Sequence, residues 1–128
     1  PTRRSSDLRK MKALTDRAIM PTTIGDIETA KTVVVTWGSN KGVLKEALDA
    51  SADDSVAGLH FAQVFPLAPA AAKWLTGKRV VVMENNATGQ FARLLRDQYT
   101  LEATESILQY DGSPFALEDV KEQLTRFV

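Results

Sequence analysis

Cysteine is absent from the 128 residues of this chain, and histidine occurs only once. Without cysteine the chain cannot form disulfides, use a thiolate nucleophile, or hold zinc or an iron–sulfur cluster through sulfur. A single histidine excludes a metal site built from several histidines. The residues of this chain therefore cannot carry out cysteine-based chemistry or form a metal site from several histidines.

Long hydrophobic runs are missing as well, since none approaches the roughly 20 residues of a membrane-spanning helix. No secretion signal opens the sequence, so we expect a cytoplasmic protein without a membrane partner. The first residue is Pro1 rather than methionine, which predicts a fragment of a longer protein. The composition that remains, 44% hydrophobic and 25% charged, is typical of one globular domain.

An excess of charge of one sign is absent too, because 16 basic side chains balance 16 acidic ones. A neutral chain offers no general electrostatic attraction to nucleic acid. The first 20 residues differ, with six bases against two acids. This basic leader leaves nucleic acid or an acidic partner surface open, but no aromatic residue lies between the bases, which favours a solvated helix or linker.

Residues 1–30 are predicted to be a helix and a linker that come from an upstream domain. Four apolar residues recur at the spacing of one helix face: Leu8, Met11, Leu14 and Ala18. Asp7 is suited to cap this helix, and Pro21 is suited to end it. We interpret the stretch at 22–31 as a linker with a turn near Gly25.

Residues 31–128 alternate apolar runs with helical stripes. Continuous apolar or β-branched runs predict strands at 32–37, 56–61, 79–83 and 101–108. Helical patterns occupy 43–48, 70–75, 91–95 and 114–127, the last starting at Pro114 with Asp111 or Ser113 as its cap. This alternation predicts a three-layer α/β sandwich, a mostly parallel sheet with helices on both faces.

Two loops that follow predicted strands contain the residues best suited to binding, because parallel α/β sheets bind ligands at the carboxyl ends of their strands. The first loop places small residues directly before a helix: Gly38, Ser39, Asn40 and Gly42. Its backbone N–H groups suit a phosphate or carboxylate, although it has neither a dinucleotide fingerprint nor a P-loop. A tight strand-to-helix turn without a ligand is the simpler interpretation.

The second loop offers a carboxylate, amides and a glycine: Glu84, Asn85, Gly89 and Gln90. These groups suit a small polar ligand or a neighbouring subunit, and equally Glu84 and Asn85 suit hydrogen bonds that fix the shape of adjacent loops. His60, alone between apolar neighbours, is interpreted as a hydrogen-bonded structural histidine. Trp37 and Trp74 are interpreted as core or interface anchors. None of these patterns predicts a catalytic residue.

Together the strands and loops resemble the C-terminal domain of transketolase-like enzymes. The segments that carry this likeness are VVVTWGSNKG at 33–42, LH at 59–60 and FPLAP at 65–69. A narrower likeness, to the α subunit of 2-oxoacid:ferredoxin oxidoreductases, is carried most specifically by VMENNATGQFARLLR at 82–96. The ending YDGSPF at 110–115 and the leader RKMKAL at 9–14 are also similar to that subunit.

The resemblance implies a parent enzyme that decarboxylates a 2-oxo acid on thiamine diphosphate and Mg²⁺, passes electrons through iron–sulfur clusters to ferredoxin, and yields an acyl-coenzyme A. In that family a Gly-Asp-Gly…Asn motif of another subunit holds the diphosphate and the metal, and this sequence lacks the motif. The substrate-contacting residues of the α subunit belong to its upstream domain. The resemblance therefore implies a structural domain without catalytic, cofactor-binding or metal-binding residues.

Our leading hypothesis is a C-terminal, non-catalytic domain at 31–128 of such an α subunit, with 2-oxoglutarate favoured as substrate of the parent enzyme. Its expected partners are the upstream domains, the β subunit and, for the parent enzyme, ferredoxin. The residues expected to contact another domain or a ligand are Gly38, Ser39, Asn40, Gly42, Glu84, Asn85, Gly89 and Gln90. The rival hypothesis is a module that binds the phosphate of a nucleotide or coenzyme A at 38–42.

Overall fold

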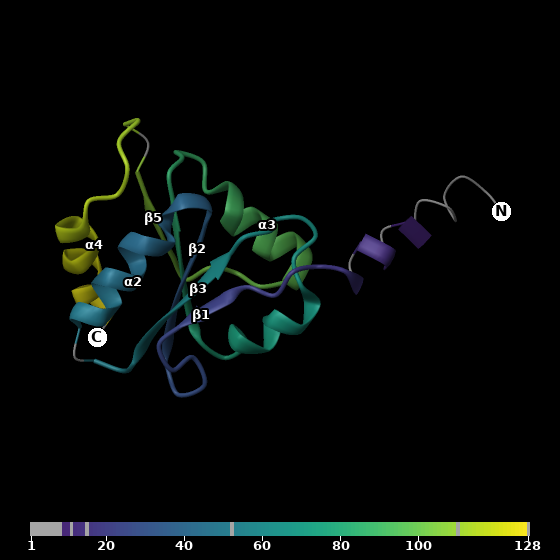
Figure 1. Cartoon of the computed structure of the whole chain (residues 1–128), viewed down its shortest axis with the longest axis horizontal. Helices are drawn as coiled ribbons and strands as arrows, with labels where there is room; N and C mark the ends of the chain where they lie inside the picture. The colour runs from purple at the N-terminus through teal and green to yellow at the C-terminus, as the bar shows by residue number, and fades with distance from the viewer. Residues whose placement is uncertain (1–8, 11, 15, 52, 110, 128) are drawn as a thin grey trace.

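The computed structural model describes residues 9–10, 12–14, 16–51, 53–109 and 111–127, which form one five-stranded sheet (Figure 1). The strands are β1 (Thr22–Ile24), β2 (Thr32–Trp37), β3 (Val56–Phe61), β4 (Arg79–Glu84) and β5 (Glu105–Leu108), in the spatial order β1-β3-β2-β4-β5. Strands β2 to β5 run parallel, and β1 joins the edge antiparallel to β3. The four predicted strands are therefore present, although β5 is shorter than 101–108.

The central strands are buried along almost their whole length, which explains their continuous apolar sequences. All six residues of β3 and five of the six in β2 are buried. In the parallel ladder, Val34 of β2 lies between Gly58 of β3 and Val81 of β4. Successive side chains of a strand point to opposite faces, so a strand without polar alternation requires cover on both faces.

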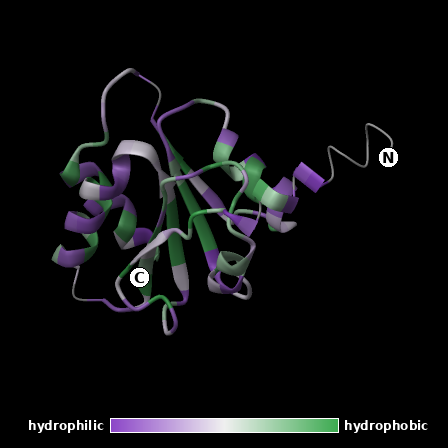
Figure 2. Cartoon of the chain, turned by 45° about the vertical axis from the view of Figure 1, so that its right-hand side comes forward, coloured by the Kyte–Doolittle hydropathy of each residue, from purple (hydrophilic) through white to green (hydrophobic). Residues whose placement is uncertain are grey.

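Helical segments cover both faces of the sheet. One layer holds α2 (Lys41–Ala50) and α4 (Leu117–Leu124), the latter continued by the 3₁₀ segment η3 (Thr125–Phe127). The other layer holds α3 (Gln90–Tyr99) and the 3₁₀ segment η2 (Pro69–Trp74). Figure 2 shows hydrophobic residues concentrated on the strands between these layers. The predicted three-layer α/β arrangement is confirmed.

The stretch at 22–31 is not the linker that we expected, because it contributes the edge strand β1 and part of the core. β1 pairs with β3, and Ile24, Ile27 and Ala30 are buried. A strand of three residues is too short for its alternation to be recognised, and Pro21 next to it favours a loop. The predicted domain boundary between 30 and 31 therefore falls after the first strand of the sheet.

The last helix starts later than predicted. α4 begins at Leu117, three residues after Pro114, so the predicted start and the predicted caps were wrong. Gln109 Nε2 donates hydrogen bonds to the carbonyls of Ser113 and Pro114, at 2.9 and 2.7 Å, which holds both residues in the loop. Asp111 accepts a hydrogen bond from the Ser113 N–H at 2.9 Å and so closes a turn instead of a helix end.

In the leader, the described residues between 9 and 16 are helical as predicted, whereas Asp7, Leu8 and Met11 lie outside the described residues. Leu14 is 50% exposed, so the sheet domain does not bury it. Figure 1 shows these helical residues lying away from the sheet. Among the described residues, no helix combines the length and apolar composition that crossing a membrane requires.

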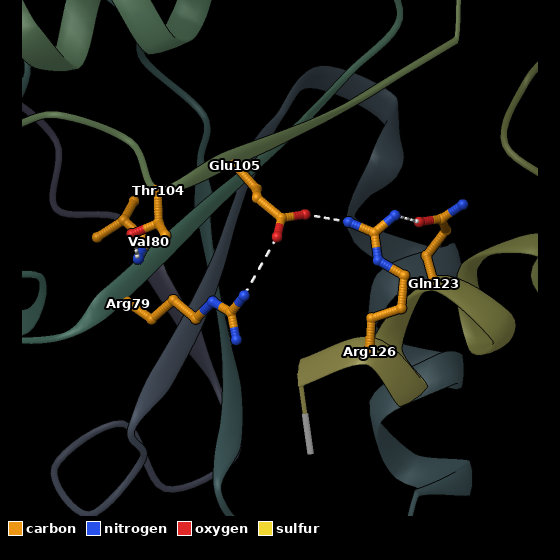
Figure 3. A network of polar contacts seen from close by, with 6 residues as sticks. All are labelled: Arg79, Val80, Thr104, Glu105, Gln123 and Arg126. Atoms are coloured by element: carbon orange, nitrogen blue, oxygen red, sulfur yellow. Dashed lines mark hydrogen bonds and ion pairs between the residues drawn. The ribbon is translucent and has the colours of Figure 1, made fainter.

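A polar network joins β4, β5 and the C-terminal residues at the amino ends of the strands (Figure 3). The Glu105 carboxyl group accepts hydrogen bonds from Arg79 Nη2, at 3.1 Å, and from Arg126. Both guanidinium groups also lie over the Phe127 ring, 5.0 and 5.1 Å from its centre. The network anchors the C-terminal residues Arg126 and Phe127 to the amino ends of β4 and β5.

Little room is left for a side chain at Gly58, where β3 runs beside β1 and packs closely against α2. A Cβ atom there would lie 2.9 Å from Leu48 Cδ1 and 3.2 Å from Ile24 Cβ.

We predict that Gly58→Ala lowers the free energy of unfolding by about 1–3 kcal/mol, because added atoms force a filled core apart. Gly42→Ala is the matched control: nothing lies within 4 Å of its Cβ position, and alanine in a helix should add about 0.5–1 kcal/mol. Denaturant unfolding that finds Gly58→Ala as stable as Gly42→Ala would contradict this close approach.

The phenol of Tyr99 gives the fold a dependence on alkaline pH. Its Oη donates to the Ala68 carbonyl at 2.5 Å, and burial raises the pKa of Tyr99 from 10.0 to about 12. Between those values the folded chain keeps a proton that the unfolded chain loses, so stability is full below the lower pKa and falls as the pH rises through the higher one. We predict that Tyr99→Phe removes this part of the alkaline decline in urea unfolding measured across that range. An equally steep decline in the variant would show that another group causes it.

Candidate functional site

Two loops meet at the carboxyl ends of the neighbouring central strands β2 and β4. The chain leaves β2 for α2 on one face of the sheet and leaves β4 for α3 on the other (Figure 1). Loops that diverge in this way leave a crevice between them, and such a switch point is where open α/β sheets bind ligands. The two loops predicted separately from the sequence thus form one candidate site.

The loop after β2 is a 3₁₀ segment, η1 (Gly38–Asn40), that leads directly into α2. Gly38 has a φ of +70°, which glycine adopts without strain. Its carbonyl lies 2.7 Å from Nε2 of the buried His60, so the predicted hydrogen bonding of that histidine is confirmed. Thr36 Oγ1 donates to the Met83 carbonyl at 3.0 Å, which ties the ends of β2 and β4 together.

The candidates of this first loop differ in exposure. Gly38 and Ser39 are exposed, whereas Asn40 is buried. Gly42 lies on the first turn of α2, and nothing is within 4 Å of where its Cβ atom would be. Ser39 is therefore the candidate of this loop whose polar side chain reaches solvent.

The carboxyl group of Glu84 organises the second loop. Glu84 is the last residue of β4 and is fully buried. Its Oε1 accepts hydrogen bonds from Asn86 Nδ2 at 2.9 Å and from the Phe91 N–H at 2.6 Å, and its Oε2 accepts one from the Ala92 N–H at 3.2 Å. The residue thereby satisfies two backbone donors in the first turn of α3, which a helix leaves unpaired.

Asn86 completes this loop from the other side. Its Oδ1 accepts hydrogen bonds from the N–H groups of Thr88 and Gly89, at 3.1 and 2.8 Å. Gly89 is buried and has a φ of +64°. The loop amides that could otherwise receive an anion are therefore occupied by the chain's own side chains. Of the predicted candidates here, Asn85 and Gln90 are exposed, and Glu84 acts from the interior.

A crevice of about 410 Å³ joins these loops to the loop after β5. Its lining is Ser39, Asn85, Gln109, Gly112, Ser113 and Pro114. Ser39 and Asn85 were predicted as candidates. Gln109 and the loop after it were not, although the segment at 110–115 is part of the family resemblance. The lining offers hydroxyl and amide groups without a charged side chain, and it suits a neutral polar surface better than a phosphate.

Among the described residues, no group of three or more histidine, aspartate and glutamate side chains is placed to hold a metal ion. The buried acid at the site, Glu84, is engaged by three N–H donors. Its carboxyl group therefore stabilises the loop between β4 and α3. The described arrangement supports binding or packing at the carboxyl ends of the strands.

Comparison with known proteins identifies relatives, although no protein-family model matches the chain. The α subunit of 2-oxoacid:ferredoxin oxidoreductase 2 from Aeropyrum pernix is 36% identical over 95 residues, 70% of this chain and 14% of that protein. The α subunit of 2-oxoacid:ferredoxin oxidoreductase 1 from Sulfurisphaera tokodaii is 27% identical over 106 residues, 81% of this chain and 17% of that protein. This chain is a homologue of those α subunits. The predicted resemblance is confirmed, and the chain spans less than a fifth of the length of these relatives.

Two solved structures share the fold of this α-subunit homologue. One is 2-oxoglutarate:ferredoxin oxidoreductase from Magnetococcus marinus, with 2-oxoglutarate, coenzyme A and succinyl-CoA bound; its TM-score is 0.79 at 23% identity, over 98% of this chain and 23% of that one. The other is the α chain of a probable 2-oxoacid ferredoxin oxidoreductase from Thermoplasma acidophilum, with a TM-score of 0.57 at 21% identity, over 84% of this chain and 96% of that one. At these identities the matches show the fold.

The role of Glu84 can be tested with a nearly isosteric change. We predict that Glu84→Gln lowers the free energy of unfolding by about 1–3 kcal/mol, because its NH₂ group then faces at least one N–H donor and leaves that donor unpaired in the interior. The exposed Glu102 provides the control, and Glu102→Gln should stay within about 0.5 kcal/mol of the parent. Urea unfolding at neutral pH measures both variants. Equal effects at the two positions would refute the structural role of Glu84.

Proposed function

We propose that the chain is a structural and assembly domain, C-terminal in the α subunit of a thiamine-diphosphate-dependent 2-oxoacid:ferredoxin oxidoreductase. The observation that carries the proposal is its homology to α subunits of that name, over 81% of this chain in one case. The parent enzyme oxidatively decarboxylates a 2-oxo acid to an acyl-coenzyme A and passes the electrons to ferredoxin. The domain itself contributes architecture to this reaction.

The chemistry of such a parent enzyme requires groups that this chain has no residues to hold. Iron–sulfur clusters are bound by cysteine thiolates, and the chain has no cysteine. The Gly-Asp-Gly…Asn motif that the family resemblance associates with thiamine diphosphate and Mg²⁺ is also missing from the sequence. We therefore assign the clusters, thiamine diphosphate and Mg²⁺ to other subunits, and coenzyme A to the parent enzyme.

The contribution of the domain, in this proposal, is a stiff edge against which other domains pack. Ser39, Asn85 and Gln90 are exposed at this edge, while Glu84 and Asn86 hold its backbone from within. A crevice lined by neutral polar groups is well suited to being covered, because burying unpaired charges would cost far more than burying hydrogen-bonding neutral groups. Its partners are the upstream domains of the α subunit and the β subunit.

The substrate and the compartment belong to the same proposal. We favour 2-oxoglutarate because a fold neighbour from Magnetococcus marinus is a 2-oxoglutarate:ferredoxin oxidoreductase. Ferredoxin as the electron acceptor follows the names of the relatives. A cytoplasmic location agrees with the absence of any membrane-crossing helix among the described residues.

The proposed function predicts which proteins co-purify with the parent protein and which reaction the preparation catalyses. Purified from its own source under anaerobic conditions, it should carry a cysteine-rich, thiamine-binding companion that mass spectrometry identifies. The preparation should reduce a viologen dye only when both a 2-oxo acid and coenzyme A are present. Parallel assays with 2-oxoglutarate and pyruvate reveal the substrate, and omission of coenzyme A is the control.

A parent protein that purifies alone and without this activity would overturn the assignment. The rival module would then be tested by calorimetry with coenzyme A and nucleotides. A Gly42→Trp variant that keeps its melting temperature but loses binding would support the rival hypothesis.

A further inference from the structure

The loop after β5 contains an aspartate–glycine pair, Asp111–Gly112, which the proposed function does not use. Among the aspartates of the sequence, Asp111 is the one that a glycine follows. Both residues are exposed, and Gly112 lines the crevice at the carboxyl ends of the strands. An aspartyl side chain can react with the peptide nitrogen of the next residue, because a bond from that nitrogen to Cγ closes a five-membered ring.

A hydrogen bond folds the Asp111 side chain back over this peptide group. Its Oδ1 accepts the Ser113 N–H at 2.9 Å, which is the turn that an aspartate forms with the backbone two residues on. The Gly112 nitrogen belongs to the ring that this bond closes, so the bond keeps the Asp111 carboxyl carbon close to that nitrogen. Holding two reacting groups together in this way favours their reaction.

Gly112 leaves the approach to its nitrogen open. It has no side chain, its φ is +86°, and nothing lies within 4 Å of where a Cβ atom would be. A glycine backbone moves between positive and negative φ without a steric penalty. The loop can therefore reach the geometry in which the nitrogen and the carboxyl carbon meet.

A second exposed aspartate, Asp54, shows the contrast. The residue after it is Ser55, which has a side chain and whose N–H donates to Asp53 Oδ1 at 2.7 Å. The Gly112 N–H, by comparison, makes no backbone hydrogen bond to another described residue. Of these two exposed aspartates, the structure thus prepares Asp111 for ring closure.

We propose that Asp111 is a site of spontaneous backbone modification, where the bond to Gly112 isomerises through a succinimide. The Gly112 nitrogen bonds to Cγ of Asp111, and one carboxylate oxygen leaves as water with the amide hydrogen and a proton from solvent. Water then adds to the main-chain carbonyl carbon of Asp111 and breaks its bond to the Gly112 nitrogen. That carbonyl becomes a carboxylate, a proton returns to solvent, and nothing is oxidised or reduced. The product is an isoaspartyl link, through which the chain runs along the former side chain.

The modification changes the wall of the crevice. The backbone gains a methylene group at position 111, and the side-chain oxygen that accepted the Ser113 N–H is no longer part of a free carboxyl group. Ser113 and Pro114 line the crevice directly after this link. The hydrogen bond that the Ser113 N–H gives to Asp111 also lowers the pKa of that carboxyl group. The group is therefore ionised at neutral pH, and the reaction is slow because it must first take up a proton.

The test follows the 128-residue chain, which buries a core on both faces of its sheet, during storage in warm neutral buffer. Thermal unfolding before and after storage shows that the chain stays folded. Digestion, peptide separation and fragmentation in a mass spectrometer distinguish isoaspartyl from aspartyl links. A synthetic peptide of residues 106–116 is the unfolded reference.

Three variants complete the test: Gly112→Ala, Asp111→Asn and, as the matched control, Asp54→Asn. In the two asparagine variants the same ring closure expels ammonia, and hydrolysis then leaves an acid. The resulting change in mass records every conversion at that position, including those that return to an ordinary aspartyl link.

We expect isoaspartate at position 111 to form in the folded chain at no less than about a third of its rate in the peptide, because the turn holds the reacting groups together. Gly112→Ala should slow the conversion about twofold to fivefold, which is the freedom of a glycine backbone expressed as a rate. Asp111→Asn should convert at least about tenfold faster than Asp54→Asn.

Two results would overturn the assignment. One is a folded chain that stays aspartyl at position 111 while the peptide converts, and the other is equal conversion at positions 54 and 111. If Asp111→Asn does not fold, the comparison of the wild-type chain with the peptide decides the question. Neither result bears on the proposed function, because the reaction needs no other subunit.

Discussion

The central strands have no face turned to water, and this constraint determines where the other elements lie. Because β2, β3 and β4 need cover on both faces, the chain must cross to one face after β2 and to the opposite face after β4. The helices α2 and α3 therefore begin at neighbouring points of one edge. The crevice of about 410 Å³ at that edge follows from this crossing, without any sequence motif for a ligand.

Glu84 then determines what that edge can bind. A helix N-terminus at a switch point is ordinarily suited to a phosphate. Here the chain's own carboxyl group accepts the N–H groups of Phe91 and Ala92, and Asn86 accepts that of Gly89. Within the segment at 82–96, the Glu84 and Asn86 side chains are thus engaged by internal hydrogen bonds. A loop shaped before any partner arrives loses little conformational freedom on association, which favours packing against another domain.

The sequence was sufficient wherever the physical signal is local and repeated. The apolar runs of β2, β3 and β4 require a covered sheet, and His60 needed only one nearby acceptor, which Gly38 provides. β1 could not be predicted, since three residues are too few for alternation to show. The part played by Gln109 also escaped, as did the buried Trp37 N–H, which has no partner among the described residues, because each depends on which distant loops the fold brings together.

The two ends of the sheet differ in a way that bears on assembly. At the amino ends, charged groups pair with each other, as Arg79 and Arg126 do with Glu105, and need no further partner. At the carboxyl ends, by contrast, the side chains that line the crevice are neutral. Covering this crevice therefore desolvates few charges. Trp37 ends β2 and lines an apolar pocket beside α3, whereas Ser39, in the loop that follows, lines the crevice, so the end of one central strand contributes to both hollows.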